Sequence, residues 1–341
     1  MSHLKQQLSH LGEAYLENMF QLIERTVQTH SPQGSSLGPM LRYHMQTGGK
    51  RLRALLPLAL AEVLEHDPAT LIPFGAACEI LHNATLVHDD LQDGDTVRRG
   101  QPTVWVEYGE ARAINLGDAM LYYTLLLVDA LDTPVSVKYM VQQRFLRETL
   151  RVIDGQEREF LLKELDAPTL EDYVLMVEGK TSGLFSLPLA GAAALCQAPE
   201  DLISALEEAS RHLGVVFQIQ DDLLDIYGDK GRDQRGTDIA EGKISMLVVN
   251  ALNLATPQEA TDLLALLGRE REAVSPQEIE DTIALFERLG AVEATVAEMD
   301  RRVALALDHP TWDNYPKVQH FLRQMADVFL MTLPPHLRSA T

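Results

Sequence analysis

Two groups of three aspartates, far apart in the chain, have the clearest capacity for chemistry. Asp89, Asp90 and Asp93 lie near the end of LHNATLVHDDLQDGD, which begins at Leu81. Asp221, Asp222 and Asp225 lie near the end of LGVVFQIQDDLLDIY, which begins at Leu213. On an α-helix, residues four positions apart share a face with Cβ atoms about 6 Å apart, and the aspartate between them can lean toward the pair. Each group is therefore predicted to form one cluster of negative charge.

Like charges at this spacing, on a helix shaped for burial, repel one another and lose hydration, so a fold keeps them only where cations neutralise them. Hard divalent ions bind carboxylate oxygens, and Mg²⁺ in particular keeps waters and shares substrate phosphates. One such group alone is most often the solvated face of an ordinary helix. Two copies, each after a mostly apolar stretch, favour two clusters that face each other and hold a diphosphate through bridging Mg²⁺.

A second set of charged residues is cationic and lies in or beside apolar helical stretches: Lys50, Arg53, His82 and Arg99. Guanidinium and ammonium groups bind phosphate directly, without a metal. Singly, each residue has a more ordinary explanation, because a lone Lys or Arg is usually solvated and a lone helix histidine is usually structural. Together they indicate a separate, metal-free pocket for a second diphosphate.

The composition restricts the class of partner and the compartment. The 341 residues are 46% hydrophobic and carry a formal charge of −21, which argues against nucleic acid or an anionic membrane surface as the main partner. The first twenty residues lack the apolar core of a signal peptide, and no run reaches the roughly 18 apolar residues of a membrane span. Cys78 and Cys196 lie in apolar stretches, so we expect reduced, buried thiols and a cytoplasmic protein; a disulfide between them is the less favoured reading.

The elements that must position these residues are helices. Nearly every long segment repeats apolar residues at intervals of three and four, without the clean two-residue alternation of strands, so the predicted class is all-α. Helices are expected at about 1–30, 68–93, 135–164 and from residue 170, with a short helix from Leu37 to the glycine pair Gly48 and Gly49. Residues 244–333 read as peripheral helices punctuated by prolines. No change in composition marks a boundary, so 1–341 is predicted to be one domain.

Several short motifs, in one order, resemble a known family, the trans-isoprenyl (polyprenyl) diphosphate synthases, and most of all its geranylgeranyl and farnesyl members. The motifs span roughly residues 48–243: GGKRLR at Gly48, EILHNATLVHDDLQD at Glu79, RRGQPT at Arg98, LGD at Leu116, GQ at Gly155, KTSGLF at Lys180, FQIQDDLLDIYGD at Phe217 and GTDIAEGK at Gly236. The resemblance implies an all-α bundle around a deep central cavity, usually a homodimer, that joins isopentenyl diphosphate head-to-tail to an allylic prenyl diphosphate.

The resemblance also implies a role for each matching residue. Up to three Mg²⁺ ions on the allylic diphosphate would be held by Asp89, Asp90, Asp93, Asp221, Asp222 and Asp225. The same diphosphate would be contacted by Arg98, Lys180 and Lys243, while Thr181 and Gln218 would line the reacting carbons. Isopentenyl diphosphate would be bound by Lys50, Arg53, His82 and Arg99. Metals and cations would stabilise the departing pyrophosphate, which is itself the expected base for the final proton loss.

One loop departs from the family pattern. The family usually has a lysine shortly before the Gly-x-Asp step, which here is Gly236-Thr237-Asp238. This loop is about two residues short, with Asp233 or Gln234 near that place. Lys230, Arg232 and Arg235 each remain candidates for the missing cation.

Product length depends on the residues beneath the first acidic group. The growing tail should run back along the helix past Thr85 and Ala84, about 6 Å below Asp89, and both are small, as in longer-product members of the family. Tyr122 and Tyr123, with Leu81, are predicted to form a deeper floor that gives the twenty-carbon geranylgeranyl diphosphate. If both tyrosines point away, much longer products are equally compatible, and a farnesyl product is the other alternative.

Two rival functions remain open. A class I terpene cyclase shares the first acidic motif, but it would have an asymmetric second metal motif and no use for the cationic set at Lys50, Arg53 and His82. A noncatalytic subunit of an active partner is also possible, although such relatives typically lose one acidic group and both are intact here.

Overall fold

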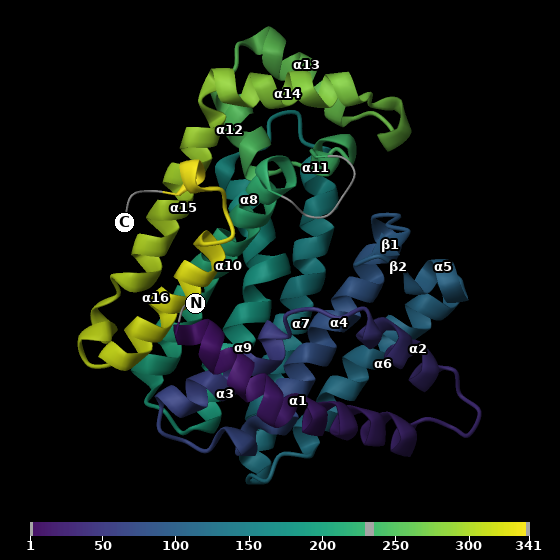
Figure 1. Cartoon of the computed structure of the whole chain (residues 1–341), viewed down its shortest axis with the longest axis vertical. Helices are drawn as coiled ribbons and strands as arrows, with labels where there is room; N and C mark the ends of the chain where they lie inside the picture. Colours follow the sequence, from purple (N-terminus) through teal and green to yellow (C-terminus); the bar gives the residue numbers. More distant parts are fainter. Residues whose placement is uncertain (1–2, 229–234, 339–341) are drawn as a thin grey trace. The chain divides into compact units, whose positions relative to one another are not determined.

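A computed structural model describes residues 3–228 and 235–338 (Figure 1). Most of these residues are helical and very few lie in strands, which confirms the predicted all-α class. The α-helices are α1 (His3–His30), α2 (Leu37–Gln46), α3 (Leu52–Val63), α4 (Ile72–Gln92), α5 (Val104–Tyr108), α6 (Glu110–Asp129), α7 (Val135–Lys163), α8 (Leu170–Val177), α9 (Gly183–Leu195), α10 (Glu200–Tyr227), α11 (Thr237–Ala240), α12 (Met246–Leu254), α13 (Pro257–Leu267), α14 (Pro276–Leu289), α15 (Ala291–Leu307) and α16 (Pro316–Leu330).

Shorter elements join them. Four are 3₁₀ turns, η1 (Pro68–Leu71), η3 (Arg271–Ala273), η4 (Pro310–Asp313) and η5 (Pro335–Leu337), and one, η2 (Glu178–Ser182), is a π-helical turn. Strands β1 (Val97–Arg98) and β2 (Gln101–Pro102) form an antiparallel hairpin in the loop after α4. The helix expected at about 68–93 is therefore η1 followed by α4, and the loop after it contains this short hairpin.

The chain falls into two compact units. Unit 1 comprises His3–Thr149 and Ser186–Glu207, and unit 2 comprises Leu150–Phe185 and Glu208–Thr341. Helices α7, α9 and α10 each contribute residues to both units. The prediction of a single domain with a central cavity stays a prediction.

Helix α4 is the centre of unit 1 and packs against α1, α3 and, most extensively, α6. It is apolar on nearly every side, as expected of a helix surrounded by others. Phe74, Ile80 and Ala84 have no exposed surface. His88 lies near the C-terminal end of α4. Its ring is so close to Gly117 of α6 that a Cβ atom on Gly117 would overlap it. The glycine of the LGD motif thus lets α6 approach the helix turn that carries the first acidic group.

The stretch Pro68–Gln92 is also long and apolar enough, by length and composition alone, to cross a membrane. It is the one such stretch among the described residues, and 67% of its most apolar window is buried inside the structure. The prediction that no stretch of the chain could span a membrane was therefore too strict. A core helix that is surrounded by other helices, as α4 is, has the same apolar composition as a membrane span.

Unit 2 is built on the second half of α10. Phe217 of α10 packs against Phe185 and Phe329, with ring centroids 5.1 Å apart in each pair. Helix α12 lies in the interior of the unit and contacts α8, α14 and α15. The predicted punctuation is confirmed, because Pro257 and Pro276 begin α13 and α14. A hydroxyl residue before each proline, Thr256 or Ser275, forms a capping box with a glutamate three positions on.

Candidate active site

The first acidic group lies at the C-terminal end of α4 in unit 1. Asp90 is 1% exposed, and its Oδ1 accepts hydrogen bonds from Nε and Nη2 of Arg98 at 2.6 and 2.5 Å. Burial raises the pKa of Asp90, and the hydrogen bonds from Arg98 oppose this shift. Asp89 and Asp93 are only half-buried. The group is therefore divided between one buried aspartate bound to the protein and two that reach the surface.

The hairpin after α4 directs its two adjacent arginines to different partners. Arg98 lies on β1 and pairs across the hairpin with Gln101, whereas Arg99 and Gly100 form the turn with φ angles of 51° and 79°. From there Arg99 donates a hydrogen bond to the backbone oxygen of Gly48. Gly49 faces the same guanidinium group so closely that a side chain there would overlap it. This contact at Gly49, together with the positive φ angles of Gly48 and Gly49 (86° and 125°), explains the glycine pair of the GGKRLR motif.

Three of the four predicted isopentenyl diphosphate ligands lie close enough to influence one another's charge. Arg53 is 8% exposed in the first turn of α3, and burial lowers its pKa to about 10, with a further contribution from Arg99. Burial, followed by Arg53 and Arg99, lowers the pKa of His82 well below its usual value. The His82 Nδ1 atom is buried and has no hydrogen-bond partner in the described part of the chain. A neutral imidazole held beside two guanidinium groups suits an anion site.

Lys50, the fourth predicted ligand, lies in the segment between α2 and α3 and is exposed. Its contact with the other three stays a prediction. The neighbouring Arg51 is structural: it is bound to Glu79 at 2.9 Å and lies over the ring of Phe20.

The second acidic group lies on α10 in unit 2 and has a similar division. Asp222 is 5% exposed, and its Oδ2 accepts hydrogen bonds from the Tyr173 hydroxyl at 2.7 Å and the Met246 N–H at 2.9 Å. Burial raises the pKa of Asp222 to about 6. Asp225 is 4% exposed and accepts from the Thr237 hydroxyl at 2.6 Å and the Asp238 N–H at 3.0 Å. These two aspartates attach α8, α11 and α12 to α10, while Asp221 is half-buried.

The remaining predicted catalytic residues also belong to unit 2. Thr181, in the π turn, donates a hydrogen bond to Gln218 Oε1 at 3.1 Å, and Gln218 Nε2 donates to Asp222 Oδ1 at 3.1 Å. Lys180 forms an ion pair with Glu159, and Lys243 forms one with Glu241 at 2.8 Å. Both lysines predicted to contact the allylic diphosphate thus have carboxylate partners, as Arg98 does in unit 1.

Two glycines hold the π turn in place. Gly155 of α7 packs directly against the backbone of Gly179 and Lys180, and Gly214 of α10 packs against Ser182. A Cβ atom at either glycine would overlap these atoms. The glycine of the GQ motif is therefore required by the close approach of α7 to the turn that carries Lys180 and Thr181.

The residues predicted to limit product length require one correction. Leu81 and Ala84 have no exposed surface, and Thr85 is half-buried. Tyr122 is 70% exposed, so its ring lies on the surface of unit 1 and does not close a cavity within this chain. Tyr123 is buried, with its hydroxyl 2.7 Å from Ser31 Oγ. Since successive helix residues point about 100° apart, only one of the two tyrosines faces inward.

The loop that departs from the family pattern is described only in part. Lys230, Arg232, Asp233 and Gln234 lie outside the described residues. Arg235 forms a two-point ion pair with Glu280 of α14 on the surface, with Nε 2.8 Å from Oε1. That partner already explains Arg235 without a substrate.

Four polar residues next to the predicted site were not among the predicted ligands: Glu79, Gln156, Glu159 and Tyr173. Glu79 and Gln156 lie inside the motifs that begin at Glu79 and Gly155, and Glu159 lies beside the second of these. An acidic residue in an apolar helix, such as Glu79, could have been identified from the sequence as a candidate functional residue. Gln156 is 8% exposed, and neither polar atom of its amide has a hydrogen-bond partner within residues 3–228 and 235–338. Tyr173 had no signal in the sequence, because only its packing reveals that it binds Asp222.

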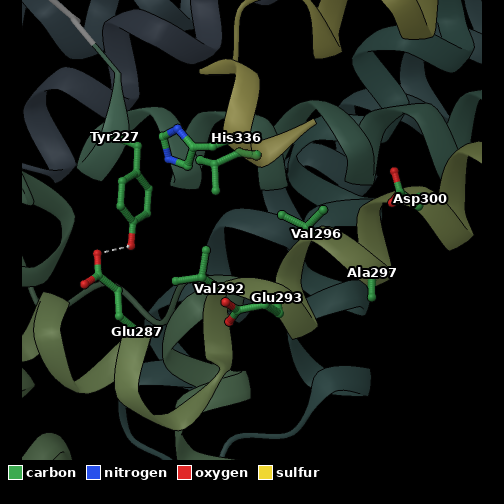
Figure 2. A pocket seen from close by; sticks show the side chains of 9 residues that line it. Tyr227, Glu287, Val292, Glu293, Val296, Ala297, Asp300 and His336 are labelled. Carbon is green, nitrogen blue, oxygen red and sulfur yellow. Dashed lines mark hydrogen bonds between the residues drawn. The ribbon is translucent and has the colours of Figure 1, made fainter. Parts of the chain in front are cut away.

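A separate cavity of about 570 Å³ lies in unit 2 between the end of α10, the α14–α15 junction and η5 (Figure 2). Its apolar floor includes Val292 and Val296, and the carboxylates of Glu287, Glu293 and Asp300 lie around it. Tyr227 donates a hydrogen bond to Glu287 at 3.0 Å across one side. None of the predicted site residues lines this cavity.

The described residues contain no group of three His, Cys, Asp or Glu side chains already arranged to hold a metal ion. The donor chemistry nevertheless fits Mg²⁺, because this ion binds through one or two carboxylates and completes its shell with water and substrate phosphate. Asp89, Asp93 and Asp221 are half-buried carboxylates of that kind.

Comparison with known proteins identifies the family that the motifs resemble. Residues 35–285 match the family model described as polyprenyl synthetase. A geranylgeranyl diphosphate synthase of Mycobacterium tuberculosis is 36% identical over 264 residues, which cover 76% of this chain and 74% of that protein. A short chain isoprenyl diphosphate synthase of Methanocaldococcus jannaschii is 32% identical over 277 residues, which cover 79% and 82%.

The fold is also that of a solved structure. The geranylgeranyl pyrophosphate synthase of Corynebacterium glutamicum, crystallised with isoprenyl diphosphate and magnesium, has a TM-score of 0.82 at 23% identity, covering 94% of this chain and 98% of that chain. At that identity the likeness establishes the all-α isoprenoid synthase fold. Family membership further implies isoprenyl diphosphate substrates and a divalent metal ion. The chain therefore belongs to the polyprenyl synthetase family and is a trans-prenyltransferase.

Proposed function

We propose that this enzyme condenses isopentenyl diphosphate with an allylic diphosphate in a Mg²⁺-dependent reaction and releases geranylgeranyl diphosphate. The observation that carries the proposal is the presence of two kinds of anion site in one chain. Two aspartate groups suit metal-bound diphosphate, and the cationic set of buried Arg53, half-buried His82 and exposed Arg99 suits a diphosphate without metal. A terpene cyclase has no use for the second kind.

The proposed metal ligands are the half-buried aspartates Asp89, Asp93 and Asp221. When bound, up to three Mg²⁺ ions would neutralise the diphosphate and promote its departure. Asp90, Asp222 and Asp225 bind the surrounding protein, so we assign them mainly to positioning the other three. This narrows the expected set of six ligands to three direct ones.

The cations of the proposed allylic site act by exchanging partners. Lys180, Lys243 and Arg98 are bound to Glu159, Glu241 and Asp90. An incoming diphosphate offers stronger charge-assisted hydrogen bonds, so these side chains turn toward it and stabilise the charge that grows on the leaving group. Thr181 and Gln218, which are hydrogen-bonded to each other, border the reacting carbons.

The twenty-carbon product is proposed from the size of the residues below Asp89 and from the name of the Mycobacterium tuberculosis relative. Thr85 lies nearly beneath Asp89 on α4, whereas Ala84 is rotated about 140° around the helix. Thr85 is therefore the residue that the tail meets first, and Tyr123 remains the candidate for the deeper floor. Farnesyl diphosphate is the alternative product.

We further propose that the enzyme is a cytoplasmic homodimer and that α4 is a core helix, not a membrane span. Both cysteines are free thiols, which suits a reducing compartment.

The exposed apolar residues of α7 support the proposed homodimer: Val135, Tyr139, Leu146, Leu150, Ile153 and Leu161. Their spacing of mostly three, four or seven residues forms one apolar stripe, and such stripes mark protein interfaces.

The experiment is a product assay of the purified chain alone, with isopentenyl diphosphate, Mg²⁺ and dimethylallyl, geranyl or farnesyl diphosphate as primer. We expect geranylgeranyl diphosphate by chromatography and no turnover in excess chelator. Asp89→Ala and Asp221→Ala should each lower turnover at least about 100-fold, because charge stabilisation is usually the largest catalytic contribution. Asp281→Asn, on the exposed face of α14, is the control and should retain full activity.

Three outcomes would contradict the proposal. A hydrocarbon product would indicate a cyclase, turnover only with an added protein would indicate a noncatalytic subunit, and activity in excess chelator would exclude the metal. Products of thirty or more carbons would refute the proposed floor alone.

A further inference from the structure

Glu79 is a buried carboxylate in the middle of an apolar helix. It lies on α4, ten residues before Asp89, and is 3% exposed. Its Oε1 accepts hydrogen bonds from Arg51 Nη1 at 2.9 Å and Asn83 Nδ2 at 3.0 Å, and its Oε2 accepts from the backbone N–H of Ala54 at 3.2 Å. A buried charge is retained only with such compensation.

Two of these bonds hold the first turn of α3. The N-cap of this helix is Arg51, which has a left-handed φ of 51° and provides no side-chain cap. The N–H groups of a first turn need acceptors, and Glu79 supplies one to Ala54 from the neighbouring helix. The same carboxylate holds the Arg51 side chain. Arg53 lies between these two residues, so Glu79 holds the chain on both sides of it, through the Arg51 side chain and the Ala54 backbone N–H.

Glu79 also supplies negative charge where cations gather. Arg53 and Arg99 both experience its field, which raises the pKa of each against the lowering caused by burial. Arg51, Arg53, Arg99 and His82 all lie in this part of unit 1. Without substrate, the carboxylate therefore offsets repulsion among side chains that must stay together to receive an anion.

A purely structural role is the competing explanation. A buried ion pair contributes little net stability relative to apolar residues of the same size, so stability alone is a weak reason to place Glu79 and Arg51 here. Their location beside Arg53 gives a more specific reason.

We propose that Glu79 is a positioning residue for isopentenyl diphosphate binding, which holds Arg53 toward that substrate by fixing the first turn of α3. The inference rests on the proposed function, and in particular on Arg53 as a ligand of that diphosphate. It assigns Glu79 no contact with either substrate and no part in releasing the allylic pyrophosphate.

The test compares the KM values for the two substrates in Glu79→Gln and Glu79→Ala. Loss of a charge-assisted contact typically reduces binding about 10-fold or more. We expect Glu79→Ala to raise the KM for isopentenyl diphosphate by about that factor, and Glu79→Gln by less, because its amide oxygen can still accept from one donor. The KM for farnesyl diphosphate should change less than about twofold in both variants.

Glu207→Gln is the matched control. It removes the ion pair of Glu207 with Arg144, which belongs to the same unit, and should leave both KM values unchanged. If Glu79→Ala does not fold, the glutamine variant still decides the question. Equal changes in both KM values, or a loss of thermal stability with both KM values unchanged, would overturn the proposal.

A double variant separates this inference from the proposed function. If Glu79 acts through Arg53, adding Glu79→Gln to Arg53→Ala should raise the KM no further than Arg53→Ala alone. Additive effects would show that Glu79 acts by another route. An unchanged KM in Arg53→Ala would instead mean that the assignment of the diphosphate site is wrong.

Discussion

His44 shows how burial fixes the charge state of a single residue in unit 1. It is 2% exposed, and its Nε2 atom lies 3.1 Å from Asn83 Oδ1. Burial, with a contribution from Arg98, lowers the pKa of His44 from 6.5 to about 3. The folded protein therefore keeps this imidazole neutral at pH values where the unfolded chain takes up a proton.

This difference predicts a loss of stability in mild acid. The pKa of His44 is lower in the folded protein than in the unfolded chain. The contribution of the neutral imidazole to the free energy of unfolding is therefore complete above pH 6.5 and is lost as the pH falls toward 3. The loss should reach about 2 kcal/mol between pH 6.5 and 5. His44→Gln keeps an N–H donor for Asn83 but does not titrate, so its stability should depend less on pH. Urea unfolding at several pH values measures this, and parallel curves for the two proteins would contradict it.

At the scale of the element, close contacts between helices explain why glycine occurs at positions that the sequence analysis identified only as parts of motifs. Gly155 lies against the backbone of Gly179 and Lys180, so Gly155→Ala must displace the π turn. We expect it to lower the free energy of unfolding by about 1–3 kcal/mol, as overpacking does, and to reduce turnover by moving Lys180 and Thr181.

Gly12 provides the matched control for Gly155. It lies inside α1, where an added Cβ atom would be 3.4 Å from the nearest side-chain atom of Leu16. Gly12→Ala should therefore raise the free energy of unfolding by about 1 kcal/mol through helix propensity. Calorimetry of both variants distinguishes the two effects, and similar melting temperatures would contradict the close contact at Gly155.

At the scale of the whole molecule, the apolar stripe on α7 predicts the oligomeric state. Leu150 and Ile153 are 66% and 53% exposed. Leu150→Glu combined with Ile153→Glu should convert the proposed dimer to a monomer, because charged groups lose hydration in an apolar interface. Sedimentation velocity measures the change. Leu305→Glu, on α15 and 42% exposed, is the control and should remain dimeric. A wild-type monomer would refute the assignment of this face.

Much of the fold could be predicted from periodicity and punctuation. The helix at 1–30, the proline-started helices and the positions of both acidic groups all follow from local sequence. What the sequence could not provide depends on packing between helices. It did not reveal that Tyr122 points outward and Tyr123 inward, because adjacent aromatic residues give the same local signal. It also did not separate the half-buried aspartates from Asp90, Asp222 and Asp225, because all six share one residue type.

The attachment of α8, α11 and α12 to Asp222 and Asp225 affects how natural variation in this enzyme should be interpreted. We expect a substitution at either position to lower activity and also to loosen the attachment of these helices, so that a turnover assay alone would not distinguish it from the loss of a metal ligand. Protease sensitivity would separate the two causes. A chain with a changed Asp221 should remain resistant to digestion, whereas one with a changed Asp222 should be cleaved before it is ever tested for catalysis.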